Sequence, residues 1–103
     1  MPVKLTWQLK EENNGYKVIE GPGLWVGRMY FNFDIEELNI KEVRQAMYYA
    51  INREELVKKA LKGAAEPGNP GHIYPESQWY SPNVKSYDYN PETSKDLLAS
   101  VGI

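Results

Sequence analysis

The chain has 103 residues and a formal net charge of −2 at pH 7, from 12 basic and 14 acidic residues that are mixed along its length. This length makes one small domain, 1–103, which should bury about two-thirds of the surface that its unfolded chain exposes. The composition, with 42% hydrophobic and 25% charged residues, excludes a disordered chain, a membrane span of roughly 20 apolar residues, and a basic stripe for nucleic acid.

The first predicted element is a helix over residues 2–12. Pro2 suits a first helical turn, residues 8–12 are good helix formers, and Asn13-Asn14-Gly15 suits a C-terminal stop. A strand is the alternative, because four apolar residues alternate: Val3, Leu5, Trp7 and Leu9.

Two strands are predicted next, at residues 16–20 and 24–33. The break at Gly21-Pro22-Gly23 between them favours a hairpin-like pair. Side chains alternate across a strand, so the second strand has one face expected in the core: Trp25, Gly27, Met29, Phe31 and Phe33. Its other face places polar groups on an apolar strand and would suit a cleft: Leu24, Val26, Arg28, Tyr30 and Asn32.

Two helices follow the second strand. Asn39 and Glu42 have the spacing of a capping box, which predicts that a helix begins there. At 100° per residue the helix has one apolar stripe: Ile40, Val43, Met47, Ala50 and Ile51. Arg44 lies on the flank of this stripe, and we expect it to pair with Asp34, Glu36 or Glu37 and so hold the helix on the strand.

Asn52 and Glu55 repeat the capping-box spacing, which predicts a break near Ile51 and a second helix over residues 53–62. Gly63 would be its C-terminal stop. The apolar face of this second helix would be Leu56, Val57, Ala60 and Leu61.

Residues 64–89 form a long Gly/Pro-rich loop without periodicity, and a loop of this length usually has a function or docks on another surface. A last helix begins after it, with Asn90 as N-cap and Pro91 at the first helical position. Gly102 ends this helix, whose apolar face is Leu97, Leu98 and Val101.

One stretch carries a family pattern. Residues 43–53 read Val-Arg-Gln-Ala-Met-Tyr-Tyr-Ala-Ile-Asn-Arg, and Tyr30-Phe31-Asn32 precedes them. This stretch resembles the V-R-x-A-x-x-Y-A-I-D-R signature of extracellular solute-binding protein family 5, the oligopeptide, dipeptide and nickel binding proteins of ABC importers. The resemblance continues through Trp79-Tyr80-Ser81-Pro82 and Tyr87-Asp88-Tyr89-Asn90-Pro91-Glu92 and covers nearly all of residues 16–103. Asn52 stands where the family usually has aspartate, and both residues cap helices.

The resemblance implies an α+β fold in which a short, mostly antiparallel sheet carries three to four helices, as part of a lobe of a type II periplasmic-binding-protein-like fold. Family members are several times longer, with two lobes that close on a ligand, and this chain corresponds to an internal fragment reaching into the second lobe. The implied partners are a peptide or small solute and an ABC permease. The implied location is extracytoplasmic, but Met1-Pro2-Val3-Lys4-Leu5 lacks a secretory signal, so this chain as it stands would remain cytoplasmic.

Five residues are candidates for ligand binding. Arg28, Tyr30 and Asn32 could bond a peptide backbone or carboxylate, and Trp25 or Trp79 could supply apolar contact. The residues alone favour a structural interpretation, in which Arg28 snorkels, Tyr30 packs under a loop and Asn32 ends the strand. Four further residues are assigned structural roles: Asn39, Arg44, Asn52 and Gly63.

Catalysis is the weakest hypothesis, and neither a cofactor nor a metal is expected. His72 is the one histidine, in a Gly-Pro loop, and a metal site normally needs three or four ligands. Without cysteine there is no thiolate site, and Gly21-Pro22-Gly23 is not a phosphate loop because proline lacks the amide proton that such loops use.

The sequence leaves two functional hypotheses open. The first is noncovalent solute capture, which should be very weak or absent in one lobe segment, because closure requires a ligand that touches both lobes. The alternative is a freestanding interaction module that homo-oligomerises through its aromatic loop and sheet edge.

Overall fold

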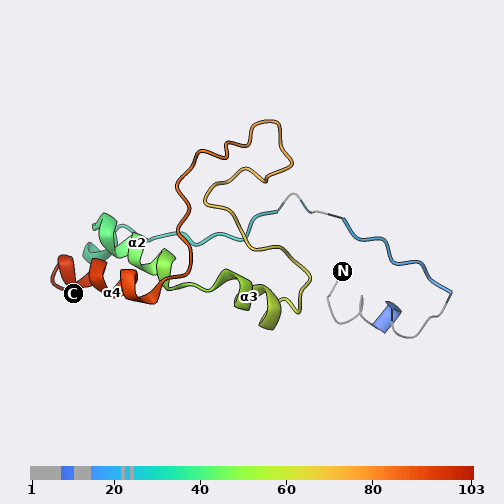
Figure 1. The fold of residues 1–103 in the computed structure, drawn as a ribbon, viewed down its shortest axis with the longest axis horizontal. Coiled ribbons are helices and arrows are strands. Elements are labelled where there is room, and N and C mark those ends of the chain that lie inside the picture. The colour runs from blue at the N-terminus through green and yellow to red at the C-terminus, as the bar shows by residue number, and fades with distance from the viewer. Residues whose placement is uncertain (1–7, 11–14, 22, 24) are drawn as a thin grey trace.

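A computed structural model describes residues 8–10, 15–21, 23 and 25–103. Its elements are η1 (Glu36–Asn39), α2 (Lys41–Ala50), α3 (Arg53–Lys59) and α4 (Pro91–Ser100). Residues 8–10 are also helical, and the rest of the helix predicted over 2–12 lies outside the described residues. Figure 1 shows α2, α3, α4 and the long loop in one part of the molecule, and an outstretched segment leading to them.

The small core lies between α2 and α4, which run antiparallel and side by side (Figure 1). Ala46 is fully buried, and Val43 and Ser94 are nearly so. The short side chains of Ala46 and Ser94 allow the two helix backbones to approach closely. The Ser94 hydroxyl then donates a 2.7 Å hydrogen bond to the Ala46 carbonyl, which satisfies the one buried polar side chain of this contact.

The ends of α4 are as predicted. The Asn90 side chain accepts a 3.1 Å hydrogen bond from the backbone N–H of Thr93, and Pro91 occupies the first turn. The N–H of Asn90 donates to the Tyr49 carbonyl at 2.8 Å, which joins the start of α4 to the end of α2. Gly102 follows the helix with a φ of 79°, a left-handed conformation that glycine adopts without strain.

The predicted break between α2 and α3 is confirmed, because Asn52 caps α3 and accepts a 3.0 Å bond from the Glu55 N–H. The helix ends at Lys59 instead of Lys62, and Gly63, with a φ of 76°, donates its N–H to the Val57 carbonyl as the predicted stop. Beyond that helix end the Lys62 backbone has a positive φ of 49°.

The Glu55 carboxylate pairs with Lys59 one turn along α3 instead of bonding back to the Asn52 N–H, so only half of the predicted capping box forms. The hydrogen bond from Lys59, and then its charge, lower the pKa of Glu55 below its ordinary value of 4.5. This pair therefore contributes its stability above that ordinary pKa and loses it as the pH falls through the lowered value.

The prediction that Asn39 caps α2 is wrong. The N-cap of α2 is Ile40, which makes no side-chain cap bond. Asn39 instead ends η1, an element that the sequence pattern did not reveal, and its amide donates to the carbonyls of Phe33 at 2.6 Å and Ile35 at 3.4 Å. The side chain is thus used to close the turn before η1.

Arg44 holds α2 on the preceding segment, as predicted. Its partners there are a carbonyl and an aromatic ring, and the prediction of a carboxylate partner is wrong. Its guanidinium donates a 2.8 Å hydrogen bond to the Leu38 carbonyl and lies 5.4 Å from the centre of the Phe33 ring. A short helix leaves its last carbonyls without internal partners, so Leu38 at the end of η1 is an available acceptor. The aromatic ring supplies the remaining stabilisation of the cation.

The predicted α+β fold with an antiparallel sheet is wrong, since no strand occurs among the described residues. Residues 15–21 and 25–32 follow one another along the long axis instead of folding back as a hairpin (Figure 1). Alternation sets which side chains share a face, but a strand also needs a second strand to accept its backbone hydrogen bonds. The face expected in the core is consequently open, with Trp25 97% exposed and Met29 and Phe33 also exposed.

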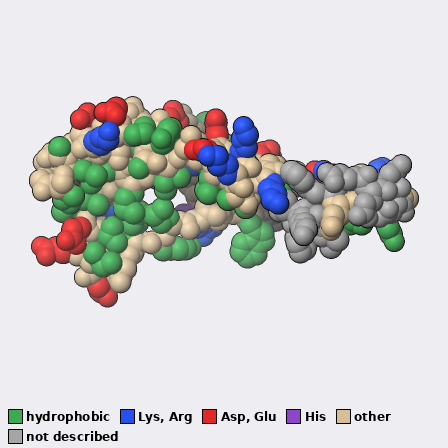
Figure 2. Space-filling view, turned by 90° about the horizontal axis from the view of Figure 1, so that it is seen from below, with side chains coloured by type: hydrophobic (Ala, Val, Ile, Leu, Met, Phe, Trp, Pro, Cys, Tyr) green, Lys and Arg blue, Asp and Glu red, His purple; other side chains and the backbone are tan. Residues whose placement is uncertain are grey.

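The molecule is elongated, with extents of 59 × 30 × 26 Å and a Cα radius of gyration of 17.8 Å. Its accessible surface of 8525 Å² is about half of the roughly 17,000 Å² expected for an unfolded chain of this mass. Folding therefore buries only about half of the unfolded surface, less than the two-thirds expected from the length. Figure 2 shows hydrophobic side chains spread over the visible face. No other described helix packs along α3, whose Leu56 is exposed and whose Val57 is half-buried.

Candidate functional site

The outstretched segment carries a shallow hollow of about 540 Å³ lined by Trp25, Val26, Arg28 and Tyr30, here called the arm hollow. The Arg28 guanidinium donates a 3.3 Å hydrogen bond to the Tyr30 hydroxyl. Both side chains leave from the same side of the extended backbone two residues apart, which is why they meet. The structure therefore brings together three of the five predicted ligand residues: Trp25, Arg28 and Tyr30.

The chemistry of the arm hollow suits a small polar ligand with an apolar part. Arg28 is exposed and has five N–H donors, of which the Tyr30 hydroxyl takes one. The remaining donors match a carboxylate or a peptide carbonyl. The indole of Trp25 provides a large, exposed apolar surface beside them.

The other two predicted ligand residues lie elsewhere. The Asn32 side chain accepts a 3.0 Å hydrogen bond from the Asp34 N–H, so its oxygen is used in the turn before η1. Trp79 belongs to the long loop and is 77% exposed, and its backbone N–H donates to the Ser77 hydroxyl at 3.2 Å. Neither residue lines the arm hollow.

A second cavity, here called the loop cleft, has a volume of about 490 Å³. Its walls are the first turn of α3, the loop around residues 67–70, and residues of the segment 80–89. The apolar part of the lining consists mostly of proline and tyrosine: Pro67, Pro70, Tyr80, Pro82, Val84 and Tyr89. The sequence predicted a loop here but no cleft, because its walls come from segments that only the folded chain brings together.

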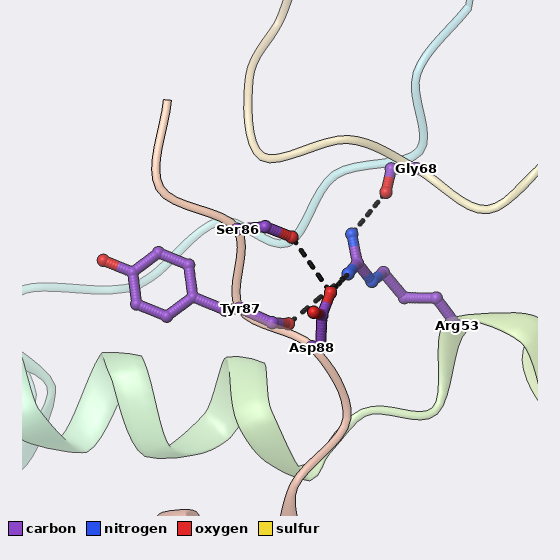
Figure 3. Close-up of polar contacts among 5 residues, drawn as sticks. All are labelled: Arg53, Gly68, Ser86, Tyr87 and Asp88. Carbon is purple, nitrogen blue, oxygen red and sulfur yellow. Dashed lines mark hydrogen bonds and ion pairs between the residues drawn. The ribbon is translucent and has the colours of Figure 1, made fainter. Parts of the chain in front are cut away.

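Arg53 lies at the centre of the contacts beside the loop cleft (Figure 3). One guanidinium nitrogen donates to the Gly68 carbonyl, and the other donates to the Tyr87 carbonyl at 3.4 Å and lies 3.7 Å from the Asp88 carboxylate. The guanidinium carbon also lies 5.3 Å from the centre of the Tyr48 ring. The Arg53 side chain is 21% exposed, whereas that of Asp88 is 91% exposed, so water screens the 3.7 Å ion pair between them. The hydrogen bonds to the two carbonyls therefore hold Arg53 more firmly than this ion pair.

The segment that contains Tyr87 is attached to α2 by aromatic packing. The Tyr87 ring centre lies 5.2 Å from that of Tyr48 and 5.3 Å from that of Tyr49, with the second pair nearly edge to face. Its hydroxyl accepts a 3.2 Å hydrogen bond from the Gln45 amide, and the Lys85 ammonium lies 5.1 Å from the ring centre. These contacts lie at distances that stabilise aromatic and cation–aromatic pairs.

Sequence reasoning used Arg53 only as the start of a helix and missed its contacts with the loop. The available signal was its place at the end of the family-like stretch, next to the capping residue Asn52. His72 is exposed in the loop, and the described part of the chain holds no group of three or more His, Cys, Asp or Glu side chains placed to bind a metal. Within the same residues no helix is long and apolar enough to cross a membrane.

Comparison with known proteins gives consistent matches at the level of sequence. Residues 2–103 match the family model for bacterial extracellular solute-binding proteins, family 5, middle region. The dipeptide-binding protein of Escherichia coli K12 is 32% identical over 94 residues, which are 90% of this chain and 17% of that protein. The peptide transport periplasmic protein SapA of Salmonella typhimurium is 34% identical over 83 residues, 80% of this chain and 15% of that protein.

A third relative, the glutathione-binding protein GsiB of an Escherichia coli O1:K1 strain, is 31% identical over 94 residues, 91% of this chain and 18% of that protein. The chain thus spans about one-sixth of the length of these relatives. No solved structure is significantly similar to this one. Because the family model matches nearly every residue, this chain belongs to the bacterial extracellular solute-binding proteins of family 5.

Proposed function

We propose that this chain is part of the substrate-binding protein of an ABC peptide importer. The observation that carries the proposal is the family match over residues 2–103, together with relatives whose names specify dipeptide, peptide and glutathione. Ligand capture in such a protein is noncovalent, so no bond is made or broken and no enzyme activity is required. The family description and the periplasmic relative also support a place of action outside the cytoplasm, with a permease as the partner.

Within this function, we propose that the arm hollow supplies one side of the ligand contact. Arg28 would bond a peptide carbonyl or carboxylate, Tyr30 would orient the guanidinium, and Trp25 would cover an apolar side chain. The 3.3 Å bond between Arg28 and Tyr30 supports this role, because it holds the guanidinium beside the indole without using all its donors. Asn32 and Trp79 do not line this hollow, so a ligand contact of Trp79 would have to come from the long loop.

The isolated chain should bind peptides very weakly or not at all. The arm hollow is shallow and its side chains face water, so a bound peptide would stay largely hydrated and would have no second surface to close upon it. Isothermal titration with peptides of two to six residues should show no saturable heat at micromolar concentrations. Micromolar affinity would contradict this expectation.

A chimera tests whether the chain can perform its proposed part in a complete binding protein. The aligned segment of the Escherichia coli dipeptide-binding protein would be replaced by this chain, and dipeptide affinity would be measured by titration. We expect the chimera to bind a dipeptide, and Arg28→Gln to weaken its affinity by about 10- to 100-fold, the loss of a hydrogen bond to a charged group.

The matched control for Arg28→Gln is Lys17→Gln, which removes an exposed positive charge of the same extended segment away from the hollow. It should leave the affinity unchanged. Equal affinities of the two variants would refute the role of Arg28. A chimera that folds but binds no peptide would count against the proposed function itself.

A homo-oligomer is the second candidate, favoured by the exposure of Trp25 and Trp79. The sheet edge expected as one contact surface does not occur among the described residues. What remains is association through aromatic side chains of the extended segment and the long loop. Its test is the concentration dependence of the particle size in solution.

A further inference from the structure

The long loop can be divided into a first limb, residues 64–72, and a second limb, residues 84–89. Both limbs bond to Arg53, which lies outside the loop at the start of α3. We infer that Arg53 is a clasp: it ties the first limb to the second, closes the intervening residues into a ring, and so sets the shape of the loop cleft.

The geometry of the guanidinium permits this role. Its two terminal nitrogens point to different limbs, one to the Gly68 carbonyl and one to the Tyr87 carbonyl (Figure 3). A planar fork presents donors in two directions at once, whereas an ammonium group is a single point. The Tyr48 ring, 5.3 Å from the guanidinium carbon, helps to hold the fork in place.

The two limbs depend on Arg53 to different degrees. The second limb has its own anchors on α2, through the packing of Tyr87 on Tyr48 and Tyr49 and its bond with Gln45. Within the described residues, no hydrogen bond or ion pair other than that of Arg53 joins the first limb to α3 or to the second limb; Asn69, for example, bonds to Ile73 inside the loop. Loss of the clasp should therefore free the first limb and leave the second on the helices.

The loop cleft depends on the same contact. Pro67 and Pro70 of its wall come from the first limb, while Val84 and Tyr89 come from the second. Release of the first limb separates these walls. The inference concerns how the loop is held and stands whether or not the chain binds peptides.

Double electron–electron resonance can test the clasp directly, because the chain has no cysteine and two introduced cysteines can be labelled cleanly. Glu66→Cys and Val84→Cys place one spin label on each limb at exposed positions. With Arg53 present, the distance distribution should be single and narrow. Arg53→Gln, and also Arg53→Lys, which keeps the charge but lacks the fork, should broaden it and lengthen its mean.

Lys85→Gln is the control, since Lys85 contacts the Tyr87 ring but bridges no limbs. It should keep the narrow distribution. Far-UV circular dichroism of each variant separates release of a limb from loss of the helices. An unchanged distribution in Arg53→Gln and Arg53→Lys, a broad distribution already in the parent, or loss of the helical signal in both Arg53 variants would each overturn the inference.

Discussion

At the scale of single residues, arginines join the pieces of this chain through backbone carbonyls more than through carboxylates. Arg44 bonds to the carbonyl of Leu38 at the end of η1, and Arg53 bonds to carbonyls of Gly68 and Tyr87 in a loop. Helix ends and irregular loops leave carbonyls without regular partners, and a partly shielded cation satisfies them. A charge count over the sequence does not reveal these contacts, because every residue has a carbonyl.

The smallest residues of the core decide whether α2 and α4 meet. Ala46→Leu adds bulk at a fully buried site against Ser94 and should lower the free energy of unfolding by about 1–3 kcal/mol. Ala50→Leu is the control on the same helix, where the side chain is exposed and a change within about 0.5 kcal/mol is expected. Urea unfolding followed by circular dichroism measures both. Equal effects would show that α2 and α4 do not pack as described.

At the scale of elements, three asparagines precede helices, but they do different things. Asn52 and Asn90 accept a bond from the helix backbone through the side-chain oxygen, whereas Asn39 donates through its amide nitrogen. The sequence predicted all three as caps, Asn39 and Asn52 from the capping-box spacing and Asn90 from the proline that follows it. The difference arises because η1 lies directly before α2 and turns Asn39 back toward the segment that precedes it.

Replacing each asparagine by aspartate distinguishes these roles. Aspartate keeps the acceptor oxygen and adds favourable charge at a helix N-terminus, so Asn52→Asp and Asn90→Asp should be neutral or slightly stabilising. Asn39→Asp loses both donated bonds and places a carboxylate near two carbonyls, and should destabilise by about 0.5–1.5 kcal/mol because the site is exposed. Thermal and urea unfolding of the three variants provide the comparison. A stabilising Asn39→Asp would mean that Asn39 is a cap after all.

At the scale of the whole molecule, the chain is extended and leaves many large hydrophobic side chains exposed. A compact domain of this length has a radius of gyration of about 13 Å, well below the 17.8 Å of this structure. The difference comes from the outstretched segment and the long loop, which bury little apolar surface. A family member several times longer has further residues that could cover such surfaces, which agrees with the share of the relatives that this chain spans.

Small-angle X-ray scattering over a concentration series tests this shape. A dilute solution should give a radius of gyration near the 17.8 Å of the Cα trace, because no described hydrogen bond or ion pair joins residues 15–30 to α2, α3 or α4. A value near 13 Å would show that the segment collapses on the helices. If the forward scattering divided by protein concentration doubles as the concentration is raised, the result would instead favour the homo-oligomer formed through exposed aromatic side chains.

The local features and the family resemblance could be predicted from the sequence alone. The starts of α3 and α4, the caps Asn52 and Asn90, the stops Gly63 and Gly102, and the absence of regular structure in residues 64–89 all follow from side chains that act on their own or neighbouring backbone. The resemblance to family 5 was equally readable, because residues 43–53 carry a linear pattern. The family model then matches residues 2–103.

Features that depend on residues distant in the sequence could not be predicted in this way. The alternating residues 24–33 predicted a strand in a sheet, but pairing needs a neighbouring strand, and the described chain provides none. Arg44 and Arg53 found carbonyl partners 6, 15 and 34 residues away, and the loop cleft arose between segments that fold together. Local patterns set which groups are available, and the path of the backbone sets which of them meet.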